Sequence, residues 1–371
     1  MLADHVYMNR ALTIAKRGRG WTSPNPMVGC VIVRDGVVIA EGWHQRAGMP
    51  HAEAMACGQC SPEALQGSVV YVTLEPCAHY GRTAPCTDLF LTHRPARIVI
   101  AMEDPNLHVK GGGIEILRSA GIDVEVGLLE KEAARLNEVF IKYSKTGMPW
   151  VTAKCAMSLD GKIATRKGHS RWITGMTARL ATHALRHAHD AILVGSRTVQ
   201  YDSPRLTTRL EKNEGRNPIR IVLDADGILE GNRDVFQDTP DVPVWVAGRK
   251  NGDYPFADEV IDLPQDVSGP DMPALMASLG ARGVTSVLIE GGGETLASAF
   301  FSGVVDKLCF FIAPKIIGGR DAVTPVEGKG IDHMNEALHF TDLTAQTYGE
   351  DVCLEAYVTH ETSGRQDAAG V

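Results

Sequence analysis

The sequence predicts an α/β protein of two domains, because β-rich and helical segments alternate in both halves of its 371 residues. Gly147-Met148-Pro149 marks the boundary, since a polar helical segment precedes it and a new apolar strand begins at Trp150. A chain of this length is long enough for two or three ordinary domains. We therefore place one domain at 1–147, a second at 148–360 and a polar tail at 361–371.

The first half contains the elements of a helix-covered sheet. The β-rich runs cover 28–34, 37–41, 69–74 and 97–102, and the helical patterns cover 7–17, the segment after Pro50, 85–92 and 131–143. Asp35-Gly36 separates the first two β-rich runs and is typical of a two-residue hairpin turn.

The second half continues the alternation with shorter, more apolar strands. Its apolar runs cover 150–157, 191–194, 219–223, 244–247, 286–289 and 308–312, and its helical patterns cover 177–188, 272–280 and 294–301. Strands that alternate with helices in this way predict a mostly parallel sheet with helices outside it.

Composition and charge narrow the class of protein. A net charge of −8 without a basic run makes the chain a poor general binder of nucleic-acid backbone, so we expect no nucleic-acid partner. Eight unequally spaced cysteines fit a reducing compartment and one metal site better than a disulfide framework. The start lacks the basic and apolar regions of a signal peptide, and no apolar run approaches the ~20 residues that span a bilayer. We expect a cytoplasmic protein with no membrane partner.

Four residues carry the strongest chemical signal. His51, Cys77 and Cys86 offer one imidazole and two thiolates, three of the ligands of tetrahedral zinc, and water takes the fourth position in a catalytic site. Glu53 lies two residues from His51, where a carboxylate can move protons without being a ligand. This is the arrangement of zinc nucleoside and nucleobase deaminases. Two alternatives are a surface histidine with two buried structural cysteines, and a zinc-stabilised binding module without catalysis.

The predicted elements bring these groups to the ends of helices and strands. His51 and Cys86 fall at helix starts, and Cys77 follows a strand. Because a helix N-terminus favours negative charge, we expect it to stabilise the thiolate of Cys86, and of Cys77 as well.

A glycine turn marks a second chemical site. Glu290-Gly291-Gly292-Gly293-Glu294 lies between an apolar strand and a helix. Glycines allow the backbone to approach a ligand, and the helix start offers N–H groups to a phosphate. Tight packing of the helix on the strand explains the same glycines equally well.

Long motifs in both halves resemble one family. Thr73 to Cys86, with eight residues between the two cysteines, closely resembles the bifunctional deaminase/reductases of riboflavin biosynthesis, as do Pro24 to Cys30 and Gly42 to Gly48. The resemblance covers nearly the whole chain and continues through 154–162, 170–174, 194–199 and 202–209. Ala84 stands where relatives usually have proline, which changes only a turn. The resemblance implies a cytidine-deaminase-like three-layer sandwich followed by a dihydrofolate-reductase-like domain.

The resemblance also implies ligand-binding residues in the second half. The cofactor-binding residues carried over from the family are Ala156, Trp172, Thr198, Asp202, Gly292, Gly293, Glu294, Thr295, Leu296, Ala297 and Ser298. The substrate-binding residues are Ser170, Arg186, Leu206, Arg209 and Glu290. The sequence context alone, without the family resemblance, indicates that Arg186 and Arg209 are solvated surface charges. Relatives often have a hydroxyl residue where this chain has Ala225, so no side-chain hydrogen bond to the cofactor is expected there.

The function implied is a two-step one. The first domain, with one Zn²⁺ per chain, deaminates 2,5-diamino-6-ribosylamino-4(3H)-pyrimidinone 5′-phosphate by hydrolysis. The second uses NADPH to reduce the ribosyl group to ribityl. Relatives often associate through the reductase half, so we expect a homo-oligomer. Two rivals are a second half that serves only as a scaffold, which Lys154, Asp160 and the glycine turn oppose, and a deaminase of free nucleosides or nucleic acid.

Several further polar residues remain open to two interpretations. Asn25, His44 and Asp104 lie in or near the deaminase motifs, where a substrate contact and a structural hydrogen bond are equally plausible. His183, His187 and His189 share one predicted helix, which fits either a metal site or a partly exposed helix face.

Overall fold

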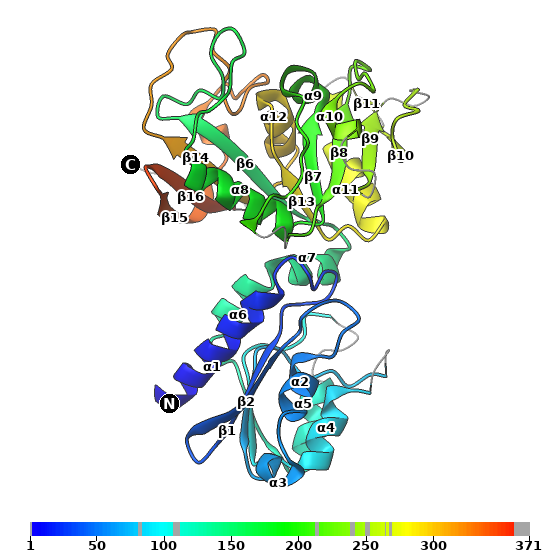
Figure 1. Cartoon of the computed structure of the whole chain (residues 1–371), viewed down its shortest axis with the longest axis vertical. Helices are drawn as coiled ribbons and strands as arrows, with labels where there is room; N and C mark the ends of the chain where they lie inside the picture. Colours follow the sequence, from blue (N-terminus) through cyan, green and yellow to red (C-terminus); the bar gives the residue numbers. More distant parts are fainter. Residues whose placement is uncertain are drawn as a thin grey trace, which may run out of the picture. The chain divides into compact units, whose positions relative to one another are not determined.

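The chain folds into two compact units in the computed structural model (Figure 1). Unit 1 comprises Met1–Trp150 and Leu279–Thr285, and unit 2 comprises Val151–Ser278 and Ser286–Val371. The structure describes residues 2–80, 84–106, 112–211, 215–237, 242–248, 253–263, 265–266 and 269–359. The tail predicted at 361–371 lies outside these residues.

Unit 1 is built on a five-stranded sheet with strand order β2-β1-β3-β4-β5. Its strands are β1 (Gly29–Arg34), β2 (Val37–Trp43), β3 (Val69–Val72), β4 (Arg97–Ile100) and β5 (Asp123–Val126). The pairs of β1 with β2 and β3 are antiparallel, and β3, β4 and β5 are parallel. Asp35 and Gly36 have φ values of 51° and 76°, as a two-residue hairpin turn requires. The predicted hairpin is therefore confirmed.

Helices cover both faces of this sheet. They are α1 (Leu2–Ala15), α2 (Ala52–Cys57), α3 (Pro62–Leu65), α4 (Cys86–His93), α5 (Gly112–Ser119), α6 (Glu130–Leu136) and α7 (Glu138–Thr146), with a 3₁₀ turn at Lys16–Gly18. In Figure 1, α1 and α6 lie on one side of the sheet and α2, α4 and α5 lie on the other. Buried apolar side chains of the strands fill the space between the layers. The three-layer sandwich expected from the family resemblance is confirmed.

The single helix predicted at 131–143 is wrong, because the structure has two helices, α6 and α7, that meet at Asn137. The Asn137 side chain is buried and holds the backbone of Met27: its Oδ1 accepts from the Met27 N–H at 2.8 Å and its Nδ2 donates to the Met27 carbonyl at 3.0 Å. These contacts place Asn137 at φ −109°, outside the helical range. A partner 110 residues away in the sequence therefore interrupts the helical pattern.

Unit 2 is built on a nine-stranded sheet with strand order β10-β9-β8-β7-β13-β6-β14-β16-β15. Its strands are β6 (Trp150–Ser158), β7 (Ala191–Gly195), β8 (Ile219–Asp224), β9 (Val244–Gly248), β10 (Glu259–Asp262), β13 (Ser286–Ile289), β14 (Lys307–Ala313), β15 (Phe340–Tyr348) and β16 (Asp351–Val358). A separate two-stranded ladder joins β11 (Gln265–Asp266) and β12 (Gly269–Pro270). The pairs from β10 to β7, β7 with β13, and β6 with β14 are parallel. The mostly parallel sheet is therefore confirmed.

The helices of unit 2 pack against this sheet. They are α8 (Met176–Ala188), α9 (Ser196–Asp202), α10 (Asp234–Gln237), α11 (Met272–Ala281) and α12 (Gly293–Phe301), with a 3₁₀ turn at Met334–Glu336. Since β6, β7, β8 and β13 run mainly as parallel neighbours, the segments that follow them emerge at one edge of the sheet, where parallel α/β sheets bind ligands.

The sequence analysis missed the hairpin of β15 and β16. The two strands are antiparallel, and β15 is the edge of the sheet. All residues of β15 except Tyr348 are exposed, so the strand has no buried face to impose alternation on its sequence. Gly349, with φ 68° at the turn, is the one local signal of a hairpin.

Gly42 sets the distance between α2 and β2, and therefore the position of the helix that follows His51. A Cβ at Gly42 would lie 2.2 Å from the Ala52 carbonyl oxygen and 2.6 Å from the Ala56 nitrogen. We expect Gly42→Ala to lower the free energy of unfolding by about 1–3 kcal/mol, because backbone atoms must move to admit the methyl group. Chemical denaturation measures this change. Gly112→Ala, whose Cβ would meet nothing within 4 Å, is the matched control; equal losses in the two variants would contradict the packing argument.

Candidate active sites

The structure of unit 1 brings His51, Cys77 and Cys86 together. His51 is the N-cap residue of α2, Cys77 follows β3, and Cys86 is the first residue of α4. His51 Nδ1 lies 3.5 Å from Cys77 Sγ and 3.4 Å from Cys86 Sγ. Tetrahedral zinc, with bonds of about 2.3 Å to sulfur and about 2.0 Å to nitrogen, holds such atoms about 3.5 Å apart. The donor set and its spacing therefore fit a zinc ion.

The start of α4 acts mainly on Cys77. The Cys86 N–H donates to Cys77 Sγ at 3.3 Å. The hydrogen bond from the Cys86 thiol, together with the His51 contact, lowers the pKa of Cys77 to about 4, whereas the same thiol pair and burial raise the pKa of Cys86. In this pair Cys77 is thus the thiol that ionises more readily, and the N–H at the start of α4 stabilises its thiolate.

Glu53 lies in the first turn of α2 with only 4% of its surface exposed. Burial raises the pKa of Glu53 to about 7, and a neighbouring His51 charge opposes the shift. Its carboxylate also interacts with the Cys86 thiol. A buried carboxyl group beside the candidate ligands is placed to exchange protons with a reacting group there.

Asn25 and His44 support the segment that carries His51. The His44 ring is 3% exposed; its Nδ1 donates to the Pro50 carbonyl, and its Nε2 accepts from the Asn25 amide, both at 3.1 Å. Burial lowers the pKa of His44, which keeps the ring neutral. The ring also meets His51 edge-on, with centroids 5.6 Å apart. Of the two interpretations, these contacts favour a structural one.

Glu75 anchors the Cys77 segment, a role that the sequence analysis missed. Its buried carboxylate accepts from the N–H groups of Gly113 at 2.9 Å, Ile114 at 3.3 Å and Asp104 at 3.1 Å. Asp104 itself accepts from the Asn106 N–H at 2.8 Å, as a turn-capping residue does. The position of an acidic residue directly after the apolar run 69–74 could have indicated this anchoring role.

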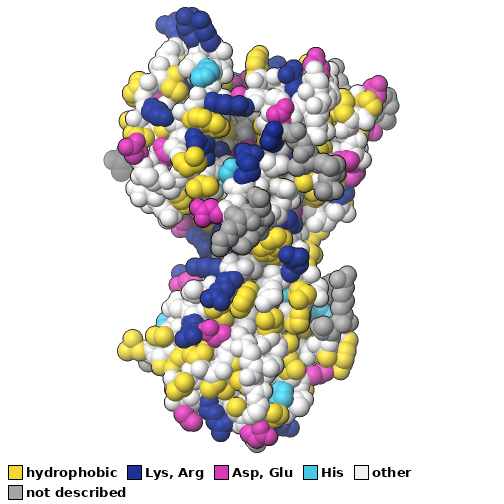
Figure 2. All heavy atoms as spheres, viewed as in Figure 1, with side chains coloured by type: hydrophobic (Ala, Val, Ile, Leu, Met, Phe, Trp, Pro, Cys, Tyr) yellow, Lys and Arg dark blue, Asp and Glu magenta, His cyan; other side chains and the backbone are white. Residues whose placement is uncertain are grey.

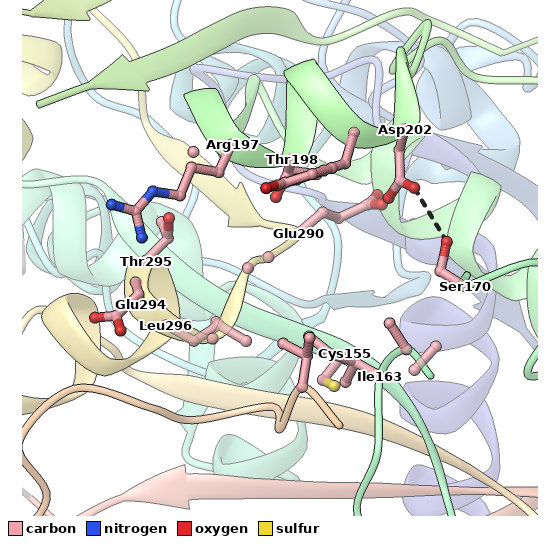
Figure 3. Close-up of a pocket in the computed structure, with 18 of the residues that line it drawn as sticks. Cys155, Ile163, Ser170, Arg197, Thr198, Asp202, Glu290, Glu294, Thr295 and Leu296 are labelled. Carbon is pink, nitrogen blue, oxygen red and sulfur yellow. Dashed lines mark hydrogen bonds between the residues drawn. The ribbon is translucent and has the colours of Figure 1, made fainter. Parts of the chain in front are cut away.

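Unit 2 contains a cavity of about 1010 Å³ at the ends of β6, β7, β8 and β13. Figure 2 shows Lys and Arg side chains around a hollow on this unit, and Figure 3 shows the residues inside the cavity. The predicted site residues that line it are Ala156, Ser170, Trp172, Arg186, Thr198, Asp202, Arg209, Glu290, Gly292, Gly293, Glu294, Thr295, Leu296 and Ser298. The structure therefore brings together residues from both predicted ligand sets.

Leu206 and Ala297 differ from the other predicted site residues. Neither lines the cavity, and their exposed fractions are 3% and 4%. Leu206 packs with Val199 and Val222 in a buried apolar cluster. Its φ of 56° turns the chain so that the following residue, Thr207, offers its carbonyl to Arg186 at 2.9 Å. The Leu206 side chain thus belongs to the core and not to the cavity wall.

The glycine turn has the features of a phosphate-binding loop. Gly291 and Gly292 have φ values of 105° and 76°, which favour glycine. A Cβ at Gly292 would lie 3.0 Å from Thr198 Oγ1, and one at Gly293 would lie 2.5 Å from the Thr324 carbonyl. The first N–H groups of α12 have no partners within the helix, so they are suited to an anion in the cavity. Packing and ligand binding therefore both constrain these glycines.

Glu290 and Arg186 form a buried ion pair on the cavity wall. Arg186 Nε and Nη2 donate to the two Glu290 oxygens at 2.6 and 2.8 Å, and both side chains are about one-tenth exposed or less. Lys154 Nζ lies 3.9 Å from Glu290. Burial would raise the pKa of Glu290, but Arg186 and Lys154 outweigh it and lower the pKa to about 2. The sequence context of Arg186 alone indicated a solvated surface charge. The structure shows instead that its side chain is buried and paired with Glu290.

The Trp172 loop forms an exposed wall of the same cavity. Trp172 is 64% exposed, and the Arg179 guanidinium lies 4.3 Å from its ring centroid. Lys315 Nζ donates to the carbonyls of Trp172 at 3.1 Å and Ile173 at 2.5 Å. Ser170 donates to Asp202 at 3.1 Å, as Figure 3 shows. The sequence analysis named neither Arg179 nor Lys315; the partners of Lys315 lie more than 140 residues away in the sequence.

The three histidines on and beside α8 form hydrogen bonds, mostly to backbone groups. His183 and His187 accept from the N–H groups of Arg209 at 3.3 Å and Arg216 at 2.9 Å. His189 is buried and bonds to the Leu185 carbonyl and the Thr152 hydroxyl. These contacts favour a structural role for all three, although His189 is less exposed than expected.

Cys309, Cys353 and Glu355 form a second group with the donor types of a metal site. Both thiols are 1% exposed and lie 3.3 Å apart under α8. Glu355 is paired with Lys307 at 2.8 Å. The charge of Glu355 is already neutralised by Lys307, and the neighbouring thiol and burial raise the pKa of Cys309. We therefore interpret this group as part of the packed core.

The two units define a class of protein: a deaminase-type zinc domain joined to a reductase domain. Residues 1–102 match the model of the cytidine and deoxycytidylate deaminase zinc-binding region, and residues 149–354 match the RibD C-terminal domain. The chain belongs to the RibD family, the bifunctional deaminase/reductases of riboflavin biosynthesis. Zinc and NADPH are the cofactors of this family, and its substrates are small molecules.

Individual relatives match over almost the whole chain. The riboflavin biosynthesis protein RibD of Actinobacillus pleuropneumoniae is 40% identical, with 96% of each chain covered. RibD of Escherichia coli is also 40% identical, with 95% of this chain and 99% of the relative covered. The solved structures of Acinetobacter baumannii RibD and of a Thermotoga maritima diaminohydroxyphosphoribosylaminopyrimidine deaminase/5-amino-6-(5-phosphoribosylamino)uracil reductase both give a TM-score of 0.86. Their identities are 35% and 36%, and each alignment covers 96% of this chain and 99% of the other.

No helix among the described residues is both long and apolar enough to cross a lipid bilayer.

Proposed function

We propose that residues 1–147 deaminate 2,5-diamino-6-ribosylamino-4(3H)-pyrimidinone 5′-phosphate and that residues 148–360 reduce the ribosyl group of the product to ribityl. The observation that carries the proposal is the coexistence of two complete candidate sites. The donor atoms of His51, Cys77 and Cys86 have the spacing that one zinc ion requires and lie beside Glu53, and a separate cavity of about 1010 Å³ has a glycine turn on its wall.

In the deaminase, His51, Cys77 and Cys86 hold zinc and Glu53 moves protons. Zinc bound there supplies a Lewis acid that makes water nucleophilic near neutral pH. Glu53 accepts the proton of the attacking water, passes it to the ring nitrogen and then assists the departure of ammonia. His44 keeps the His51 segment in place through the Pro50 carbonyl.

In the reductase, the chain positions two ligands against each other. The turn from Gly292 to Ser298 would hold the cofactor phosphates, and Ala156, Trp172, Thr198 and Asp202 would line the rest of the bound cofactor. Ser170, Arg186, Leu206, Arg209 and Glu290 hold the sugar phosphate, with Leu206 acting through its backbone. The Arg209 guanidinium suits the phosphate because an arginine fork binds phosphate oxygens in pairs, whereas the Arg186 fork is bonded to Glu290. NADPH, when bound, would supply a hydride to C1; the C1–O bond of the sugar ring breaks, and the ring oxygen takes up a proton to become a hydroxyl.

The exposed edge strand β15 and the free cysteines support proposals about self-association and cellular location. We propose a homo-oligomer that associates through β15, since this edge strand exposes its side chains, among them Leu343 at 65%. Light scattering measures the assembly mass. A cytoplasmic location agrees with the eight free cysteines.

One assay tests both activities. The purified protein is given the diaminopyrimidine ribosyl phosphate, and ammonia release and NADPH oxidation are followed separately while bound metal is measured by elemental analysis. We expect one zinc per chain and both signals, with ammonia release lost on removal of zinc by a chelator and restored by its return. Reduction of supplied deaminated product should continue without zinc, because that step uses the other site.

Two results would overturn parts of the proposal. Ammonia release without NADPH oxidation would make unit 2 a scaffold. A protein that holds one zinc per chain but releases no ammonia from this substrate would exclude it as the deaminase substrate.

A further inference from the structure

The sheet order of unit 2 determines where each end of an extended dinucleotide can lie. The glycine turn follows β13, which lies between β7 and β6. Lys154, whose Nζ lies 3.9 Å from Glu290, and Ala156 are residues of β6 on the other side of this turn, and both line the cavity. With the phosphates at the turn and the reacting ring on the β6 side, the adenosine end lies over the ends of β7 and β8.

Arg197 occupies that end of the cavity. It is the second residue of α9, whose start packs against the start of α12: a Cβ at Gly195 would lie 2.5 Å from Thr295 Oγ1. The Arg197 side chain is 64% exposed and lines the cavity. Figure 3 shows its side chain extending beside Thr295, a residue of the first turn of α12.

Asp226 holds this guanidinium at the rim. Arg197 Nη2 donates to Asp226 Oδ2 at 3.1 Å, across the turn that follows β8. Among the described lining residues at the ends of β7 and β8, Arg197 is the one cation, and the neighbouring Ala225 has no polar side chain. The pair is exposed, so Arg197 can exchange a hydrated carboxylate for a ligand phosphate at little cost.

We propose that Arg197 recognises the 2′-phosphate of the cofactor and makes this reductase prefer NADPH to NADH, an inference that rests on the proposed reductase function. The guanidinium fork matches two oxygens of a phosphate, whereas a 2′-hydroxyl offers it no charge. Asp226 orients Arg197 when the site is empty and repels the phosphate unless Arg197 lies between them.

Direct binding of NADP⁺ and NAD⁺, measured by calorimetry, tests this proposal, because the two differ only in the 2′-phosphate. We expect the wild type to bind NADP⁺ at least about tenfold more tightly than NAD⁺, a ratio typical of charge-assisted hydrogen bonds. Arg197→Ala should remove this difference by weakening NADP⁺ alone, and Arg197→Lys should retain part of it. KM for NADPH should rise with the same ratio while KM for NADH stays unchanged.

The matched control is Arg205→Ala. Arg205 forms a similarly exposed pair, with Asp234 at 4.0 Å, and does not line the cavity, so its loss should leave both affinities unchanged. Asp226→Asn should preserve or increase the preference for NADP⁺. The proposal is overturned if Arg197→Ala keeps the preference, or if it weakens NADP⁺ and NAD⁺ equally, as a pyrophosphate contact would. Failure of the wild type to bind or oxidise either cofactor would instead overturn the proposed reductase function.

Discussion

Ammonia release by Glu53→Gln enzyme is expected to fall by about 10²–10⁴-fold, the contribution usual for a positioned proton-transfer group. Glutamine retains the size of the buried side chain but cannot accept and return a proton. His51, Cys77 and Cys86 are untouched, so the variant should keep its zinc. Reduction of supplied deaminated product by NADPH should proceed at the wild-type rate, because Glu53 lies in unit 1 and the reductase cavity lies in unit 2.

The measurement is a pair of rates on each variant, with zinc content determined on the same samples. Glu63→Gln is the matched control, since Glu63 is also in the first turn of a short helix of unit 1 but is exposed and distant from the candidate ligands in sequence. A Glu53→Gln enzyme that holds zinc and still releases ammonia at the wild-type rate would show that another group transfers the proton.

Arg186→Met is expected to lower the free energy of unfolding by about 3–5 kcal/mol, because it leaves the buried carboxylate of Glu290 without its main partner. Lys154 lies 3.9 Å away, beyond hydrogen-bonding distance. NADPH oxidation should be lost together with the geometry of the cavity wall, whereas ammonia release should persist. The double variant Arg186→Met/Glu290→Gln should recover much of the stability, which chemical denaturation measures as a mutant cycle.

The stability difference between the wild type and Arg186→Met should depend on pH in a definite direction. In the folded chain the pKa of Glu290 is lowered from 4.5 to about 2, so the ionised group contributes stability above pH 4.5. That contribution is lost as the pH falls from 4.5 toward 2. In Arg186→Met the buried carboxyl group takes up a proton more readily, so the gap between wild type and variant should narrow as the pH falls. A gap that is constant between pH 7 and pH 3 would contradict the assignment of the stability to this ion pair.

Local sequence patterns were sufficient for much of the fold. The Asp35-Gly36 turn, the apolar strands on both sides of Gly147 and the helix after the glycine turn were all predicted and are present in the structure. Each depends on neighbouring residues, because turn chemistry and hydrophobic periodicity act over a few positions. The sequence also predicted the donor set of His51, Cys77 and Cys86, because one imidazole and two thiolates in that order are typical of a zinc site.

Other features required partners that are distant in sequence. Asn137 divides two helices because it binds Met27, and β15 pairs at the edge of the sheet without a buried face of its own. Local propensity contains no record of such contacts, so the sequence analysis predicted one helix and missed the hairpin.

The sequence by itself determined the α/β class, the family and the chemical types of the candidate site residues. Only the tertiary structure decided what each side chain contacts. It placed Arg186 against Glu290, 104 residues away, put the Leu206 side chain in the core, and brought Arg197 beside the start of α12. The physical reason is that burial and charge pairing depend on which segments the sheet brings together, and that order is a property of the whole fold.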